Sequence, residues 1–242
     1  MDKLKVVFIC PSFNISSNVE KLVGSFKDQV NPNWDCIIVD DISSDSTYED
    51  LIRETKGDER FIIIKNQEKK YALRNIVEAS KKLDDNIIVA VVDGDDSLCN
   101  DKTVEILLGA YADGSEVVWT AHKWDTNGMN ISGPIPENVD PYFWPWRSSH
   151  LRTFKSSLLK KIDNKNFMNF KGEWFKRGYD QALMLPLMHL TKKRKYVPEV
   201  CYLYNIDSSS IPSDQRDWCE MDQISTINFV RARGFINTGE VK

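Results

Sequence analysis

Three aspartates lie in the segment Asp93-Gly94-Asp95-Asp96, directly after the apolar run at residues 87–92. Hard divalent cations such as Mg²⁺ and Mn²⁺ prefer oxygen ligands, and neighbouring carboxylates beside a pyrophosphate supply them. The glycine permits a tight turn that directs the flanking carboxylates toward one point. Asp-Gly-Asp is also common turn chemistry, so a plain turn is the alternative to a metal site.

A second acidic pair, Asp40-Asp41, follows another short apolar run. An acidic side chain at a strand end can hydrogen-bond a ribose hydroxyl or a base N–H. The segment Ser43-Ser44-Asp45-Ser46 comes next, and Asp45 or Ser46 is expected to cap the following helix. Two successive aspartates before that cap exceed what capping requires, which favours a ligand contact for this pair.

The segments that position these acidic residues alternate between apolar runs and helix-period stretches. Four runs rich in β-branched residues predict strands at 4–10, 35–39, 61–65 and 86–92. Apolar residues at helical spacing predict helices over 19–30 and 73–83. This alternation predicts a mostly parallel sheet flanked by helices and joined by right-handed crossovers. Ligands bind such sheets beyond the carboxyl ends of the strands, so the polar residues there are expected to share one edge.

The second half of the chain has a less regular pattern. Residues 126–146 are rich in Gly, Pro and Asn and predict a long loop, which in compact domains is usually functional. The other expected elements are a strand at 117–120, helices at 149–162, 180–190 and 215–233, and a strand pair or one bent strand at 195–205. Pro186 is expected to bend or interrupt the second of these helices.

Composition limits the classes of protein to which the chain can belong. Its 242 residues are 41% hydrophobic and 28% charged, as in a soluble globular protein with a sizeable core. Five scattered cysteines without a CxxC pair argue against a disulfide framework and favour a reducing compartment. No apolar run approaches the ~20 residues of a membrane helix, and a strand-like segment near residue 4 leaves no room for a signal peptide.

Positive charge is concentrated in one region. Residues 147–200 contain thirteen Lys or Arg against four Asp or Glu, although the net charge of the chain is −4. One interpretation is two solvated faces of opposite sign. The other is an acidic, metal-binding half joined to a basic half that meets an anionic partner.

Four motifs in these segments resemble the family 2 glycosyltransferases, which have the GT-A fold. They are Val6-Val7-Phe8-Ile9-Cys10-Pro11-Ser12-Phe13-Asn14, Trp34-Asp35-Cys36-Ile37-Ile38-Val39-Asp40-Asp41-Ile42-Ser43-Ser44-Asp45, Ala72-Leu73-Arg74-Asn75 and Asp93-Gly94-Asp95-Asp96. They are similar to the family's strand with Pro-Thr-Tyr-Asn, its Asp-Asp-Gly-Ser-x-Asp segment, its Ala-Arg-Asn motif and its DxD signature. The third motif has one inserted residue. The match covers roughly the first 125 residues.

The resemblance implies a nucleotide-sugar donor, with UDP as the commonest nucleotide of the family, and a divalent metal cofactor, Mn²⁺ or Mg²⁺. Donor contacts are then expected from Pro11, Ser12, Asn14, Asp41, Arg74, Asp93 and Gly94. A guanidinium forks well onto phosphate oxygens, which suits Arg74. Asp95 and Asp93 are the implied metal ligands. Asp207 either substitutes for the family's third ligand, a histidine, or that ligand is absent.

The segment Gly178-Tyr179-Asp180 resembles the family element that carries the catalytic base, with Tyr179 in place of the usual glutamate. At a helix N-terminus the dipole would keep Asp180 ionised and ready to accept a proton from an acceptor hydroxyl. A plain N-cap is the alternative role.

Acceptor contacts are expected from the stretch that precedes this segment. The candidates are Trp146, Arg147, His150 and Arg152. His150 belongs to a stretch that resembles a motif before the base-bearing segment in some members of the family. A structural role is the alternative for this isolated histidine.

The function implied is that of an inverting hexosyl- or pentosyltransferase, in which residues 1–125 bind the donor and residues 126–242 form a small mixed acceptor-binding region of the same domain. The expected acceptor is the hydroxyl of an anionic saccharide or glycolipid, used in the cytoplasm, with a peripheral position at the membrane face. Glycosylation of a hydroxymethylated DNA base and a non-catalytic nucleotide- or glycan-binding module are the alternatives. A nucleotidyltransferase is disfavoured, because no Gly-rich basic loop follows the first strand.

Overall fold

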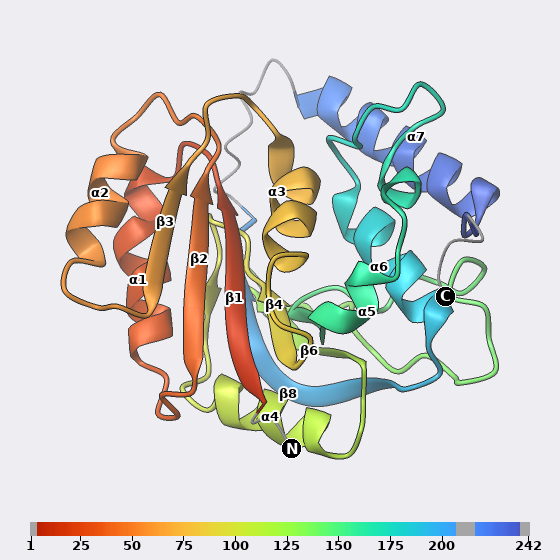
Figure 1. Ribbon diagram of the computed structural model, residues 1–242, viewed down its shortest axis with the longest axis horizontal. Coiled ribbons are helices and arrows are strands. Elements are labelled where there is room, and N and C mark those ends of the chain that lie inside the picture. The colour runs from red at the N-terminus through yellow and green to blue at the C-terminus, as the bar shows by residue number, and fades with distance from the viewer. Residues whose placement is uncertain (1–3, 207–215, 238–242) are drawn as a thin grey trace.

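The computed structural model describes residues 4–206 and 216–237, and an eight-stranded sheet of order β3-β2-β1-β4-β7-β6-β8-β5 lies at its centre (Figure 1). The strands are β1 (Lys5–Ser12), β2 (Trp34–Asp40), β3 (Phe61–Lys65), β4 (Ile87–Val91), β5 (Ser97–Leu98), β6 (Val117–Trp124), β7 (Arg152–Lys155) and β8 (Arg194–Tyr204). Strands β1 to β4 pair in parallel, as predicted. In the other half, β7 is antiparallel to both β4 and β6, β8 is parallel to β6, and β5 is antiparallel to β8. The predicted α/β fold is therefore confirmed, with a mixed second half.

Helices cover both faces of the sheet. They are α1 (Val19–Lys27), α2 (Thr47–Glu54), α3 (Tyr71–Ser80), α4 (Thr103–Ala112), α5 (Ser156–Lys160), α6 (Tyr179–Leu190) and α7 (Arg216–Arg233), with short 3₁₀ turns η1 (Ser16–Asn18) and η2 (Asn164–Phe167). Successive strand residues point to opposite faces. Val7 and Ile9 therefore join the core under α3, α5 and α6, whereas Val6 and Phe8 join the core under α1, α2 and α4. Within the described ranges, no helix combines the length and apolar content needed to cross a bilayer.

The helix predicted over 149–162 is wrong, because residues 152–155 form strand β7 and only residues 156–160 are helical. This short strand fills the space between β4 and β6, where Arg152 pairs with both Val91 and Trp119. The β-branched Thr153 donates a hydrogen bond to the Val118 carbonyl at 2.7 Å. Long-range pairing thus overrides a helical pattern that is only local.

The segment predicted as a strand pair or one bent strand forms one bent strand, β8. Strand β8 runs alongside β6, with register shifts on either side of Ala121. Such irregularities bend a strand and increase its twist. The bend carries the far end of β8 across to β5, where Leu203 pairs with Ser97 just beyond the acidic segment.

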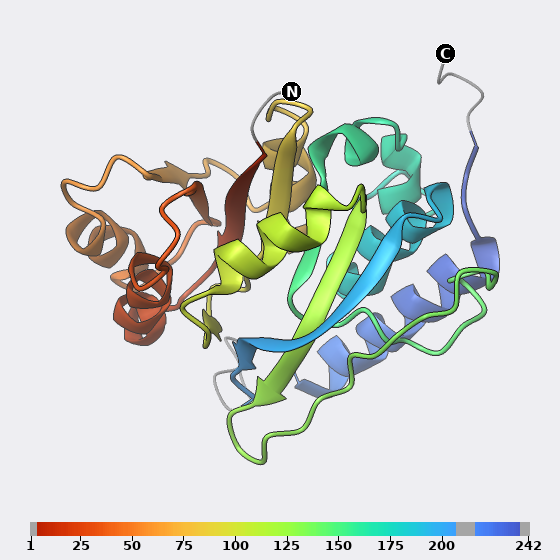
Figure 2. The ribbon, with the colours of Figure 1, turned by 90° about the horizontal axis from the view of Figure 1, so that it is seen from below.

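Two arginines fasten the long loop over 126–146 to the rest of the fold. Arg194 donates to the carbonyls of Pro136, Glu137 and Val139 in the loop, at 3.0, 2.8 and 2.7 Å. From α7, Arg231 donates to two further loop carbonyls, and the loop runs beside this helix (Figure 2). Part of the positive charge in the basic region is therefore used inside the protein.

Replacing Arg194 by lysine tests this attachment. An ammonium cannot reproduce the fork that reaches several carbonyls at once, so we expect Arg194→Lys to lower the free energy of unfolding by about 1–3 kcal/mol. Urea titration followed by circular dichroism measures the change. The neighbouring Lys193 is exposed, and Lys193→Ala should stay within about 0.5 kcal/mol of the unsubstituted protein. Equal stability of the two variants would contradict the proposed attachment.

Candidate functional site

The polar segments that follow β1, β2 and β4 line a single pocket of about 550 Å³, which confirms that they share one edge of the sheet. Nine residues singled out in the sequence lie on its wall: Pro11, Ser12, Asp41, Asp93, Gly94, Asp95, His150, Arg152 and Asp180. The last three come from the second half of the chain. The pocket therefore joins the two halves.

Gly94 allows the acidic segment to pack directly on the end of β1. Its N–H donates to the Pro11 carbonyl at 3.2 Å. A β-carbon at this position would lie 2.7 Å from the Ser12 Oγ and 3.1 Å from the Pro11 carbonyl oxygen, closer than side chains pack. The acidic segment and the end of β1 approach so closely that only glycine fits at residue 94, and a turn alone would not require this.

Both carboxylate oxygens and the backbone N–H of Asp93 form hydrogen bonds. Its Oδ2 accepts a hydrogen bond from Arg152 Nη2 at 2.9 Å, and its Oδ1 accepts one from the Tyr179 hydroxyl. Its N–H donates to the Tyr202 hydroxyl oxygen at 3.0 Å. Arg152 is almost fully buried, with 1% of its surface exposed. A buried guanidinium requires a compensating anion, and Asp93 provides it.

Asp93, Asp96 and His150 form a candidate metal-binding cluster, because each offers a ligand atom within 4.8 Å of the other two. Burial, reinforced by the charges of Asp93 and Asp95, raises the pKa of Asp96 well above its ordinary value. A cation between these carboxylates would relieve that repulsion.

The imidazole of His150 is suited to bind a cation. Its ring stacks between Tyr202 and Tyr204, with centroids 4.6 and 5.0 Å away. Burial, with the nearby charge of Arg152, lowers the pKa of His150 well below its ordinary value, so the ring is neutral at neutral pH. Its buried Nδ1 has no hydrogen-bond partner within the described part of the chain. A neutral imidazole and hard carboxylates fit a divalent cation such as Mn²⁺.

The sequence and the structure suggest different third ligands. His150 was assigned to the acceptor side, yet it lies beside the acidic segment. Asp95 also lies on the pocket wall, as predicted. Its carbonyl accepts hydrogen bonds from Asn18 and Asn205 at 3.1 and 3.3 Å, which fix the segment in place. Asp207 lies outside the described residues.

Asp41 organises the part of the pocket wall at the end of β2. It accepts hydrogen bonds from the side chain of Asn66 at 2.7 Å and from the backbone N–H groups of Lys70 and Tyr71 at 2.9 and 2.8 Å. Burial alone would raise the pKa of Asp41, but these hydrogen bonds together lower it. The residue is therefore ionised at neutral pH, and it holds the segment before α3 against the end of β2.

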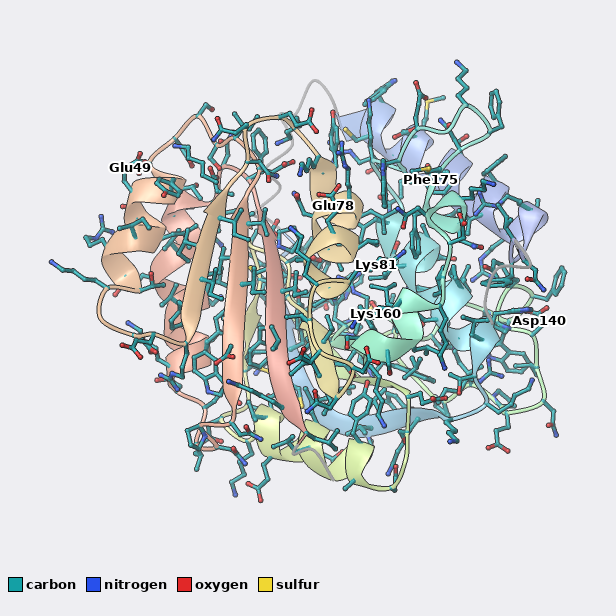
Figure 3. All side chains as sticks on the ribbon, viewed as in Figure 1. Glu49, Glu78, Lys81, Asp140, Lys160 and Phe175 are labelled. Carbon is teal, nitrogen blue, oxygen red and sulfur yellow. The ribbon has the colours of Figure 1, made fainter. Side chains whose placement is uncertain are left out.

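The basic residue predicted to contact the donor does not lie on the pocket wall. Arg74 does not line the pocket: it pairs with Glu78 at 2.7 Å and with Glu68 at 3.1 Å. Glu78 is labelled on α3 in Figure 3. Lys69 lines the pocket instead, and its Nζ donates to the Asp41 carbonyl at 3.0 Å. The sequence signal for Arg74 was a motif, whereas the i,i+4 spacing from Arg74 to Glu78 indicated a pair on the helix surface.

Three other predicted residues do not line the pocket. Asn14, in a left-handed conformation with φ 51°, accepts a hydrogen bond from the Ser44 N–H at 2.9 Å and so joins two loops at the edge of the pocket. Trp146 packs against the hydrophobic core. Arg147 donates to the Ile131 carbonyl at 3.4 Å. These contacts are structural.

Asp180 lies in the first turn of α6 and faces the pocket. It is the second helical residue, so the plain N-cap interpretation is wrong; Gly178 occupies the cap with φ 60°. A β-carbon at Gly178 would lie 3.0 Å from the Gln223 carbonyl oxygen, which brings α6 and α7 close together. Burial raises the pKa of Asp180, although the charge of Arg152 opposes the shift. A buried carboxylate with a raised pKa is a stronger base than an exposed one.

Comparison with known proteins agrees with this geometry. The model of the family described as glycosyl transferase family 2 matches residues 7–183. TuaG of Bacillus subtilis (strain 168), which is named as a glycosyltransferase of teichuronic acid biosynthesis, is 37% identical over 99 residues. That alignment covers 40% of this chain and only 38% of TuaG.

Solved structures share the fold. S. aureus TarS in complex with UDP-GlcNAc superposes with a TM-score of 0.69 at 16% identity, over 97% of this chain and 68% of that one. The mannosyltransferase PcManGT from Pyrobaculum calidifontis, in complex with GDP-Man and Mn²⁺, superposes with a TM-score of 0.59 at 16% identity, over 92% of this chain and 63% of that one.

Removing the imidazole of His150 tests the candidate metal cluster. We expect His150→Ala to weaken Mn²⁺ binding at least about tenfold, because the cluster loses a neutral nitrogen ligand. Titration calorimetry with Mn²⁺ measures the affinity. His189 is more exposed, lies outside the pocket lining and serves as the matched control. Unchanged Mn²⁺ affinity in His150→Ala, with normal binding by His189→Ala, would rule out His150 as a ligand.

Proposed function

This chain belongs to glycosyl transferase family 2, and on that basis we propose that it transfers a sugar from a nucleotide-diphosphate sugar to an acceptor hydroxyl with inversion at the anomeric carbon. One observation carries the proposal. Asp180, a half-buried carboxylate with a raised pKa, lines the same pocket as the Asp93–Asp95 segment and the ends of β1 and β2. A base and a nucleotide-sugar site in one pocket are what direct displacement at an anomeric carbon requires.

The donor end of the pocket would be formed by the ends of β1, β2 and β4. Asp93, Asp96 and His150, together with Asp95, would hold a divalent metal ion. Such an ion, when bound, neutralises charge that develops on a leaving diphosphate. Lys69 lies on the same wall, where an ammonium could neutralise further phosphate charge. TarS and PcManGT bind UDP-GlcNAc and GDP-Man, which supports a nucleotide-diphosphate sugar, and we favour UDP as the nucleotide.

Asp180 would act on the acceptor. Its carboxylate would accept the proton of the acceptor hydroxyl while that oxygen attacks the anomeric carbon from the face opposite the diphosphate. The carbon–oxygen bond to the diphosphate breaks as the new glycosidic bond forms, which inverts the anomeric centre. Positive character on the sugar ring in the transition state would be stabilised by the surrounding carboxylates.

The acceptor side is cationic. Lys176 and Arg177 line the pocket directly before the turn that carries Asp180. Their position favours an anionic acceptor, because charge-assisted contacts to phosphate or carboxylate groups would place a neighbouring hydroxyl at the base. The similarity to TuaG supports an anionic saccharide or glycolipid as the first candidate. A hydroxymethylated base in DNA has the same anionic backbone chemistry and is the second.

The two halves of the chain would supply different contacts to the donor and the acceptor. Residues 1–125 would supply most donor contacts and residues 126–242 the acceptor contacts. His150 and Arg152, however, cross from the second half to the donor segment. The two halves would therefore share the metal end of the pocket.

Replacing the base tests the reaction. We expect Asp180→Asn to lower kcat about 10²- to 10⁴-fold, because the amide cannot accept the acceptor proton, and to change donor affinity less than about threefold. Radiolabelled sugar transfer and calorimetry with the nucleotide-sugar measure the two quantities. Asp140 lies outside the pocket lining and is labelled in Figure 3, so Asp140→Asn serves as the control.

The acceptor class is tested in parallel assays. One offers an anionic polysaccharide and the other hydroxymethylated duplex DNA, after a screen of nucleotide-sugars for metal-dependent hydrolysis. Transfer to polysaccharide supports the first class, and transfer to DNA replaces it with the second. Binding of nucleotide-sugars without hydrolysis or transfer to either acceptor would instead indicate a binding module.

The raised pKa of Asp180 also predicts a pH dependence. Only the ionised form accepts a proton, so kcat should fall with decreasing pH at a higher pH than an exposed aspartate would titrate. The charged groups that act on it are Arg152, Asp93 and Arg231. The folded state binds the proton more tightly than the unfolded chain, so this residue destabilises the fold once pH rises above its unfolded pKa.

Asp180→Asn should therefore raise the unfolding temperature at neutral pH although it lowers kcat. Differential scanning calorimetry at several pH values measures this gain. It should shrink as pH falls, because the aspartate itself then becomes neutral in both states. A variant less stable than the unsubstituted protein at neutral pH would contradict the burial of an ionised Asp180.

A further inference from the structure

Tyr179 connects the first turn of α6 with the acidic segment after β4. Its hydroxyl donates a hydrogen bond to Asp93 Oδ1, and Arg152 Nη2 donates both to Asp93 Oδ2 and to the Tyr179 hydroxyl oxygen, each at 2.9 Å. The guanidinium also lies 5.0 Å from the centroid of the tyrosine ring. Three side chains from β7, α6 and the segment after β4 thus form a closed triangle.

The triangle is rigid for electrostatic reasons. Arg152 is buried and needs the negative charge of Asp93. A tyrosine hydroxyl carries its proton at neutral pH, so it is a hydrogen-bond donor to the carboxylate. Releasing Tyr179 from Asp93 would leave an oxygen of this half-buried carboxylate without that hydrogen bond. The contact is therefore present before any ligand binds.

Asp180 follows Tyr179 directly in the chain, so whatever fixes Tyr179 also fixes the backbone that carries Asp180. On the opposite side, α6 is set by the close approach of Gly178 to the Gln223 carbonyl of α7. Rotation or sliding of the first turn of α6 would change the distance from Asp180 to the donor end of the pocket. The Tyr179 hydroxyl opposes such a movement, since it joins residues 86 positions apart.

We propose that Tyr179 is a positioning residue, which holds Asp180 at a fixed distance from the donor segment through its hydrogen bond to Asp93. The inference rests on the proposed function, because it assumes that Asp180 accepts the acceptor proton. Misplacing a reacting group by about 1 Å can slow a reaction about 10²-fold. Loss of the hydroxyl should therefore slow transfer more than it weakens donor binding.

Tyr179→Phe isolates the hydroxyl, since it keeps the ring beside Arg152. We expect kcat for transfer to fall about 10- to 100-fold and donor KM to change less than about threefold. The ratio of sugar transfer to donor hydrolysis by water should fall as well, because water needs no positioned acceptor. That ratio does not depend on the fraction of folded enzyme. Tyr196, which lies on β8 and packs against the core, provides the control Tyr196→Phe.

A double-mutant cycle that combines Tyr179→Phe with Asp93→Asn tests whether the Tyr179 hydroxyl acts through Asp93. Tyr179→Phe should lower kcat less in the Asp93→Asn background than in the unsubstituted protein, because the carboxylate that accepts the hydrogen bond from the Tyr179 hydroxyl is already absent. An equal decrease in both backgrounds, or kcat and transfer ratio in Tyr179→Phe within twofold of the unsubstituted protein, would overturn the inference. An unsubstituted protein that transfers no sugar would instead overturn the proposed function.

Discussion

The ion pair between Arg152 and Asp93 is the interaction on which the pocket depends. Antiparallel pairing of β7 with β4 places Arg152 opposite Val91, two residues before Asp93. A guanidinium buried in the sheet would cost several kcal/mol without an anion, so the strand and the acidic segment must form together. The same pairing brings His150, two residues earlier, to Asp96. The second half of the chain therefore completes a site that the first half begins.

This dependence explains how far the sequence could predict the structure. The strands β1 to β4, the shared edge and the acidic segment follow from local apolar patterns and strand-end chemistry. Strand β7 does not, because four residues carry too little periodicity and only their neighbours β4 and β6 make them extended. The contacts of Arg152 and Tyr179 with Asp93 span 59 and 86 residues, and no local motif encodes them. Arg74 was predicted from a family motif, whereas its spacing to Glu78 indicated the ion pair that the structure contains.

The positive charge of residues 147–200 is less available than its sum suggests. Arg152 neutralises Asp93, Arg194 binds loop carbonyls, and Lys160 pairs with Asp85 on the surface. Lys176 and Arg177 line the pocket together with Arg152, and they directly precede the turn that carries Asp180. A charge count from the sequence does not distinguish Lys and Arg side chains that pair within the protein from those that face the pocket. The contacts in the structure make that distinction. Much of the positive charge in this region is therefore engaged in contacts within the protein.

The contact between Gly94 and β1 has a genetic consequence. Every missense change in a glycine codon adds a β-carbon, and at this position that atom would collide with the Ser12 hydroxyl and the Pro11 carbonyl. The carbonyl belongs to the backbone of a central strand and cannot rotate away. No missense change of the Gly94 codon therefore gives a residue that fits here. A neighbouring aspartate codon, in contrast, can change to glutamate or asparagine by one nucleotide substitution. Backbone packing therefore constrains residue 94 independently of any ligand that the pocket binds.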